Sequence, residues 1–287
     1  MSDNDTIPAP PATLPELLEA DAPASVRAIY DGLRDGAATP IAALIWRHIA
    51  TYPGMLEACW TSLGPLFADG TLPDTAWRVA RETAPRHLLP KVAPRARALL
   101  GIAPQDEATI QALVEAYNRA NPVNLLGVKV LLSRLDSDAP REAALPDALT
   151  DALWSPPAPI THPIPPMTVP ADMDPAVRRL LNDLRCGDTG QIDPVVPSLY
   201  RHLTGWPAYL AVLHMGLDPL FRDGAMAAAT ARVAQAMDTE AVRLARRIDP
   251  VPDLAGQDRL QATMRRFAGG VIPTMIVVGR AIADQLD

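Results

Sequence analysis

The stretch WRHIATYP at residues 46–53 returns as YRHLTGWP at residues 200–207, and this repetition decides the fold. Further along, LGPLFADG at 63–70 returns as LDPLFRDG at 217–224. Both pairs keep one spacing, because 200 − 46 and 217 − 63 are each 154. A self-match at so long a period predicts two related halves rather than a solenoid of short units. We expect the halves to bury their apolar faces against each other and to enclose a small-molecule pocket at the seam.

Composition divides the 287 residues into four parts. Residues 1–13 are acidic and proline-rich, and we expect them to be disordered. The first repeat spans 14–135, a linker rich in proline spans 136–173, and the second repeat spans 174–287. Each repeat has the size of a small domain. The sequence therefore predicts two tandem homologous repeats that form a pseudo-dimer.

Both repeats show the apolar spacing of helices. The two matching apolar sets are Val26, Ile29, Tyr30 and Leu33 in the first repeat, and Val177, Leu180, Leu181 and Leu184 in the second. No strand-like alternation of apolar and polar residues occurs, so we predict an all-α fold. Thr39-Pro40 and Asp193-Pro194 each pair an N-cap residue with a proline, and a helix is predicted to begin at each.

Charge and composition exclude several classes of function. The formal net charge is −7, and the chain contains no basic run, which argues against a nucleic-acid partner. The two cysteines, Cys59 and Cys186, lie far apart and form no CxxC motif. No cluster of His, Cys, Asp and Glu has the spacing of a metal site. We expect a small-molecule ligand and no metal or other cofactor.

The sequence also bears on localisation. The first residues lack the basic and apolar regions of a signal peptide. No apolar run reaches the roughly 18 residues of a membrane span, and the apolar stretch 270–278 is interrupted by Pro273, so we predict a buried helix there. These features indicate a cytoplasmic protein without a membrane partner. The candidate assembly beyond the monomer is a homodimer.

The repeat, the linker and the segment YNRANPVNLL at 117–126 together resemble one family, the group I 2-haloacid dehalogenases. The resemblance covers about residues 24–286 and implies an all-helical pseudo-dimer that acts on D- and L-2-haloacids. In this family, an Asp and an Asn hold a water molecule that attacks the halogen-bearing carbon directly. The Asp is the general base, which must lie within hydrogen-bond reach of that water.

The resemblance can be carried over position by position. The family's Asn falls on Asn121, and its catalytic Asp falls on Leu199, directly after a retained Ser198. A family Tyr falls on Asn124, and two pocket aromatics fall on aliphatic residues. A leucine can neither accept a proton nor orient a water molecule. We therefore predict a reshaped ligand pocket without the family's base, lined by Ile41, Leu44, Asn121, Asn124, Ser198 and Leu199.

Three residues are candidates for a catalytic role in place of that base. Asn121 precedes a proline, so it is either a helix cap or a pocket residue. His214 lies among apolar helical neighbours and is a titratable candidate, whereas Asp218 precedes Pro219 and is predicted to begin a loop or a new helix. His48 and His202 occupy equivalent repeat positions, which indicates a structural or surface role.

Three functions follow from these observations. The first is a divergent member of the dehalogenase family that acts on a small organic acid or another apolar-tailed small molecule. The second is a non-catalytic small-molecule binder. The third is a 2-haloacid dehalogenase, a hydrolase of the carbon–halogen bond, whose base has been relocated. An enzyme needs a titratable group in the pocket, whereas a binder needs only shape and a few polar contacts.

Overall fold

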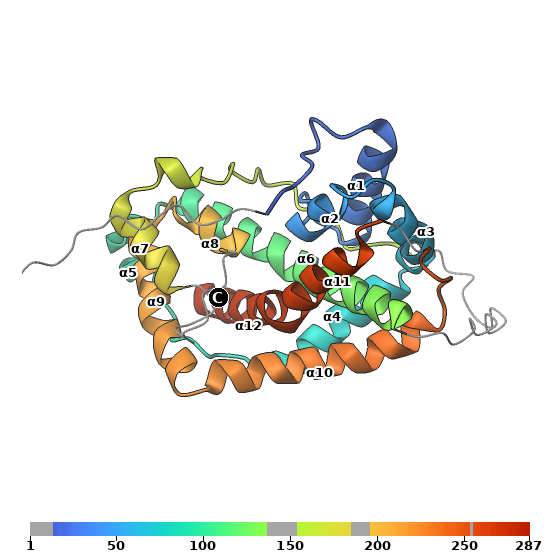
Figure 1. Ribbon diagram of the computed structural model, residues 1–287. Helices are drawn as coiled ribbons and strands as arrows, with labels where there is room; N and C mark the ends of the chain where they lie inside the picture. Colours follow the sequence, from blue (N-terminus) through green and yellow to red (C-terminus); the bar gives the residue numbers. More distant parts are fainter. Residues whose placement is uncertain (1–13, 137–153, 185–195, 253–254) are drawn as a thin grey trace, which may run out of the picture.

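The computed structural model describes residues 14–136, 154–184, 196–252 and 255–287. Every regular element in this part of the chain is a helix, so the predicted all-α class is confirmed (Figure 1). The predicted disordered start, the Asp193 cap and residues 137–153 of the linker lie outside the described residues.

Helices occur throughout both of the segments that the sequence divides into repeats. The first half contains α1 (Ala24–Gly36), α2 (Leu44–Ile49), α3 (Met55–Ala68), α4 (Thr71–Thr83), α5 (Pro94–Leu99) and α6 (Pro104–Leu135). The second contains α7 (Pro175–Asp183), α8 (Ser198–Leu203), α9 (Pro207–Arg222), α10 (Ala225–Ala245), α11 (Gln257–Arg266), a π-helical turn (Phe267–Val271) and α12 (Ile272–Leu286). Helices α2 and α8 begin 154 residues apart, because 198 − 44 is 154, and so do α4 and α10, because 225 − 71 is 154. Superposition of the two halves stays a prediction.

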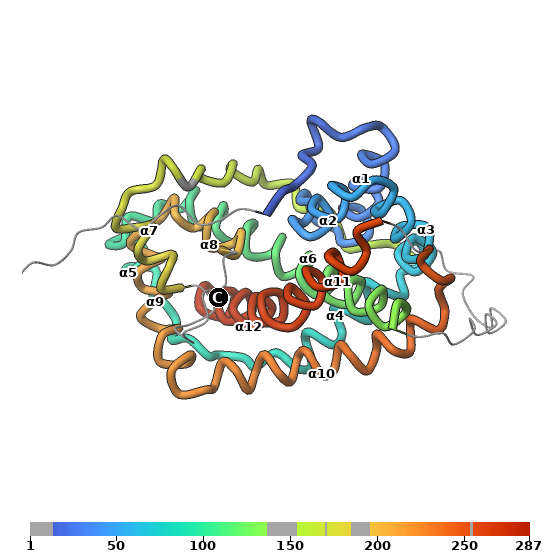
Figure 2. Tube along the Cα trace, viewed as in Figure 1, coloured from blue at the N-terminus to red at the C-terminus, as the bar shows by residue number. Residues whose placement is uncertain are grey.

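The centre of the molecule is the pair α6 and α12, which pack along each other. Helices α4 and α10 cover one side of this pair, while α1–α3 and α7–α9 lie towards opposite ends (Figures 1 and 2). The apolar stripe predicted for α1 is buried, since Val26, Ile29, Tyr30 and Leu33 are each at most 6% exposed. This burial of one helical face supplies most of the stabilisation that short helices need.

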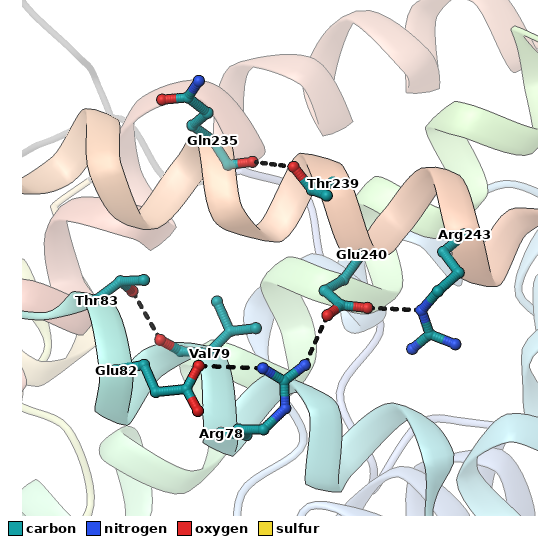
Figure 3. Close-up of polar contacts among 8 residues, drawn as sticks. All are labelled: Arg78, Val79, Glu82, Thr83, Gln235, Thr239, Glu240 and Arg243. Atoms are coloured by element: carbon teal, nitrogen blue, oxygen red, sulfur yellow. Dashed lines mark hydrogen bonds and ion pairs between the residues drawn. The ribbon is translucent and has the colours of Figure 1, made fainter.

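Helices α4 and α10 are also joined by polar contacts (Figure 3). Arg78 donates to Glu240 at 2.6 Å and to Glu82 at 3.1 Å, and Arg243 donates to Glu240 at 2.8 Å. Burial raises the pKa of Glu240, but hydrogen bonds from Arg243 and Arg78 outweigh it and hold the pKa below its ordinary value. Because Arg78 is 43% exposed, these pairs contribute little to stability beside the apolar contact.

Helix α6 contains Pro122 in its interior, so of the two alternatives for Asn121 the helix cap is wrong. Proline lacks an N–H and leaves a carbonyl one turn earlier without its helical partner. Pro273 occupies the corresponding place in the second half, since 273 − 122 is 151, and there the π-helical turn comes directly before α12. The long helix thus stays regular in one half and widens in the other.

The helix predicted to begin at Pro40 begins instead at Leu44, with Ala43 as its N-cap. The Thr39 hydroxyl donates to the backbone carbonyl of Ala116 in α6 at 3.4 Å, so it serves a tertiary contact rather than a cap. Ile41 consequently lies in the loop before α2, not one turn before Leu44 on a shared helical face.

The linker residues 154–169 form an extended segment that runs across α4, α6 and α8 (Figure 1). Trp154 donates to Asp74 at 3.0 Å, and the His162 imidazole lies 2.9 Å from the Thr109 hydroxyl. At its far end, Thr204 donates to the Thr168 hydroxyl at 3.0 Å. This segment is therefore fixed to the helical body along its length.

The apolar stretch near the C-terminus belongs to a longer helical run. By length and composition alone, Gln257–Leu286 could cross a membrane, with a mean hydropathy of 1.4 in its most apolar window. In the described structure 78% of that window is buried inside the molecule, which is the pattern of a core helix.

Candidate functional site

A cavity lies where α2, α6, α8 and the start of α12 meet. Its walls are formed by Ile41, Ala43, Leu44, Ile45, Arg47, Ala116, Tyr117, Ala120, Asn121, Asn124, Met167, Val196, Pro197, Ser198, Leu199, Phe267, Val271, Ile272 and Met275. The empty space, counted out to its open mouth, is ≈ 750 Å³. The wall is mostly apolar with a few polar groups, which is the usual composition of small-molecule sites.

All six residues predicted to line a ligand pocket lie in this wall. They come from three separated regions: the loop and first turn of α2, the middle of α6, and the first turn of α8. Leu199 is 1% exposed, and Ile45, its counterpart 154 residues earlier, is 2% exposed and also lines the cavity. Equivalent positions of the two halves thus face the same space.

Most polar side chains of the cavity wall come from α2 and α6, and Ser198 comes from α8. Arg47 lines the cavity and forms an ion pair with Glu16, whose carboxylate oxygen lies 2.7 Å from its Nε. Asn124, 5% exposed, accepts a hydrogen bond at Oδ1 from the indole N–H of Trp46 at 2.7 Å. Among the described residues of the wall, none is an Asp or a Glu.

The opposite wall is apolar and comes from the second half. Its members are Phe267, Val271, Ile272 and Met275, each at most 6% exposed. They are the counterparts of Ala116, Ala120, Asn121 and Asn124, because 267 − 116 and 275 − 124 are each 151. The cavity is therefore lined by two corresponding helical runs of different polarity.

The solved structures with a similar fold include three of D-2-haloacid dehalogenases. A D-2-haloacid dehalogenase mutant in complex with D-2-CPA is similar, with a TM-score of 0.76 and 17% identity over 97% of this chain and 99% of that chain. A second D-2-haloacid dehalogenase mutant gives a TM-score of 0.75 at 18% identity over 98% of each chain. A complex of the enzyme with L-LA gives 0.70 at 18% identity over 98% of each chain.

The fold is that of the D-2-haloacid dehalogenases. At this level of identity, the likeness is one of architecture. No protein-family model matches the sequence, and no curated protein matches it.

Within this dehalogenase-like fold, two of the predicted catalytic candidates lie away from the cavity. His214 and Asp218 are both on α9 and are absent from the wall. Asp218 does not begin a loop or a helix as predicted, because α9 continues through Pro219; its carboxylate lies 3.0 Å from Arg222 Nε, one turn later. The third candidate, Asn121, lines the cavity.

The equivalent histidines of the two halves are buried, so the surface interpretation is wrong for both. His48 is 4% exposed and its Nδ1 lies 2.7 Å from the carbonyl oxygen of Pro15. His202 is 7% exposed and hydrogen-bonds to the backbone of Pro165. Each imidazole thus bonds to the backbone of an extended segment that precedes the first helix of its half, which is a structural role.

His202 has an additional partner that faces the cavity. Its Nδ1 lies 2.9 Å from the hydroxyl of Tyr117, a wall residue that sequence reasoning missed. Burial, together with the charge of Arg201, lowers the pKa of His202 to about 4. Burial also raises the pKa of Tyr117, although a hydrogen bond with Ser198 and the charge of Arg47 act in the opposite direction. Both side chains are therefore neutral near pH 7.

Sequence reasoning also missed Arg47, Met167 and the four residues of the apolar wall. The repeat could have predicted that wall, because the pocket residues predicted on α6 have counterparts 151 residues later that also line the cavity. No group of three or more His, Cys, Asp or Glu side chains that could hold a metal ion occurs among the residues that the structure describes. Cys59 is buried, and burial raises the pKa of its thiol to about 12.

Proposed function

We propose that this chain is a divergent relative of the 2-haloacid dehalogenases that binds a small carboxylic acid with an apolar tail in the cavity. The observation that carries the proposal is Arg47. It is the one charged side chain among the described residues of the wall, and its neighbours are amides, hydroxyls and apolar groups. A guanidinium is a preferred partner of carboxylates because its N–H donors form a fixed fork.

The ion pair with Glu16 leaves room for this role. It engages the Nε end of the guanidinium, whereas the terminal nitrogens carry the other N–H donors. A carboxylate bound there would have its tail directed towards the apolar wall of Phe267, Ile272 and Met275. The cavity thus combines a polar end for a head group with an apolar end for a chain.

The wall does not favour the hydrolytic chemistry of the dehalogenases. The position of the family's base is Leu199, and the nearest titratable pair is Tyr117 with His202. A base whose pKa is about 4 is unprotonated at pH 7 but is a weak proton acceptor, because an effective general base has a pKa near the working pH. We therefore expect no halide release from 2-chloropropionate of either hand, although both enantiomers can bind.

Calorimetric titration with hexanoate and with the uncharged hexanamide tests the proposal. The carboxylate should bind at least about 10-fold more tightly than the amide, because a hydrogen bond to a charged group is worth about 1.5–3 kcal/mol. Arg47→Met should abolish that difference. Arg81→Met is the matched control, because Arg81 is exposed on α4 and lies outside the wall.

Two results would contradict the proposal. Equal affinity for hexanoate in the wild type and in Arg47→Met would show that the carboxylate binds elsewhere. Steady halide release from 2-chloropropionate, at ordinary enzymatic rates on the order of 1 s⁻¹ or faster, would instead support a dehalogenase with a relocated base.

A further inference from the structure

The side-chain amide of Asn124 is held in one orientation. Its Oδ1 accepts from Trp46 Nε1 at 2.7 Å, and both residues are buried, at 5% and 1% exposed. An indole N–H can only donate, so the amide must turn its oxygen towards Trp46 and its NH₂ group away. Asn124 therefore presents a donor, not an acceptor, to its other surroundings.

Close packing keeps Trp46 in place. A Cβ added to Gly127, one turn after Asn124 in α6, would lie 3.3 Å from the Trp46 ring. The indole thus rests on the backbone of α6 next to the amide that it binds. A glycine at this position lets α2 approach α6 closely enough for the hydrogen bond to form.

Trp46 and Arg47 are consecutive in α2, so the same turn of α2 holds Asn124 and supplies the cation. Both Arg47 and Asn124 line the cavity. Its wall consequently offers a guanidinium and the NH₂ group of a fixed amide. No carboxylate among the described residues of the wall could receive an ammonium group.

We propose, on the basis of the function proposed above, that the ligand carries a second hydrogen-bond acceptor on the carbon next to its carboxylate, as 2-oxo acids do, and that Asn124 selects for it. The oxo group would accept from Asn124 Nδ2 while the carboxylate pairs with Arg47. The hydroxyl oxygen of a 2-hydroxy acid can also accept from Asn124 Nδ2, but in a less favourable geometry. A halogen is a weak acceptor, and the ammonium group of a 2-amino acid would meet donors and a like charge.

The test is a calorimetric titration of the wild type with five matched five-carbon acids. These are 2-oxopentanoate, 2-hydroxypentanoate, 2-chloropentanoate, 2-aminopentanoate and pentanoate. We expect the oxo acid to bind about 10-fold more tightly than pentanoate. The hydroxy acid should lie between these two, the chloro acid should bind like pentanoate, and the amino acid should bind most weakly of the five.

Asn124→Asp is the informative variant, because an Asp oxygen can still accept from Trp46 while the NH₂ group is replaced by a second oxygen. The oxo acid should lose its advantage over pentanoate. Trp46→Phe provides a second route, since the amide is then free to turn. It should reduce the advantage of the oxo acid while leaving the affinity for pentanoate within about 2-fold. Circular dichroism of both variants checks that the helical fold is retained.

The outcomes separate the two proposals. If none of the five acids binds, the proposed function itself fails. If all five bind with equal affinity, the carboxylate site stands and the selection by Asn124 is overturned. If the oxo acid is preferred equally in the wild type and in Asn124→Asp, another group donates the hydrogen bond to the oxo oxygen. The assignment to Asn124 is then overturned.

Discussion

Helix α6 and its counterpart, the run from α11 through the π-helical turn to α12, occupy corresponding places in the two halves but face the cavity differently. The first presents Asn121 and Asn124, whereas the second presents Ile272 and Met275 at the matching positions. Both runs contain a proline at the same offset. The two runs differ both in the side chains on the cavity face and in the π-helical turn that only the second contains.

This contrast shows how a repeated sequence can form an asymmetric site. Two identical halves would surround a symmetric cavity with the same chemistry at both ends. Here α6 supplies two amides and its counterpart supplies apolar side chains at the matching positions, so the proposed ligand with a head and a tail would bind in one direction. The following predictions test pairs of corresponding residues, starting with the largest expected effect.

The first pair is His48 and His202, of which His202 contacts Tyr117. The pKa of His202 is lowered to about 4 in the folded state, against about 6.5 when unfolded. Between these values, the unfolded chain binds a proton that the folded chain does not. The free energy of unfolding should therefore fall as the pH drops from about 6.5 to about 4, by on the order of 3 kcal/mol at 1.36 kcal/mol per pKa unit.

Urea denaturation at a series of pH values measures this effect. Other groups also titrate in this window, so the comparison is with His202→Gln, which lacks the titratable imidazole. The difference in stability between wild type and variant should shrink as the pH falls. Parallel profiles for the two proteins would show that His202 is not held neutral by its surroundings.

The second pair is Leu199 and Ile45, which face the cavity from α8 and α2. Leu199→Asp restores the residue type of the dehalogenase base but introduces a carboxyl group at a position that is 1% exposed. Burial should raise its pKa, and the imperfectly satisfied group should cost about 1–3 kcal/mol of stability. Little halide release should be gained, because Ile41, Leu44 and Asn124 differ from the family pattern as well.

Thermal unfolding measures the loss of stability of Leu199→Asp, and a halide-release assay measures its activity. The comparison variant is Ile45→Asp, at a position that is 2% exposed. We expect similar losses of stability for the two variants. An unchanged melting temperature for Leu199→Asp would place that side chain in solvent and remove it from the pocket.

Much of the fold could be predicted from local patterns, whereas half of the cavity could not. Helical apolar spacing predicted the all-α class and the buried face of α1. The start of α2 was misplaced because Thr39 bonds to Ala116, which is 77 residues away along the chain. The residues next to Thr39 do not indicate whether its hydroxyl caps a helix or bonds to a residue far along the chain.

In the site, too, some residues could be predicted from the sequence and others could not. Asn121 and Leu199 were found through the family resemblance, which compares positions one at a time. Arg47 was missed because an arginine on a short helix is usually solvated, and only the tertiary arrangement of α2 and α6 places it in the wall. The π-helical turn was missed because periodicity analysis assumes one helical pitch throughout.

The last pair has the smallest expected effect and concerns that turn. Gly269 and Gly270 lie there, whereas the matching positions of α6 are Asn118 and Arg119, since 269 − 118 is 151. Asn118 donates to the carbonyl of Gly279 at 3.1 Å, and Arg119 donates to the carbonyl of Ala38 at 3.1 Å. The first half therefore uses these positions for tertiary contacts, and the second half leaves them without side chains.

Nothing lies within 4 Å of a Cβ added to either glycine of the turn, and neither glycine has a positive φ. Gly269→Ala and Gly270→Ala should each raise the free energy of unfolding by about 0.5–1 kcal/mol, because alanine loses less conformational freedom on folding. Gly279→Ala in α12 is the matched control. Its Cβ would lie 2.2 Å from Asn118 Oδ1, so that variant should be less stable than the wild type. Urea denaturation of all three variants measures the effects, and a loss of stability for Gly269→Ala would show that the turn depends on the absence of a side chain.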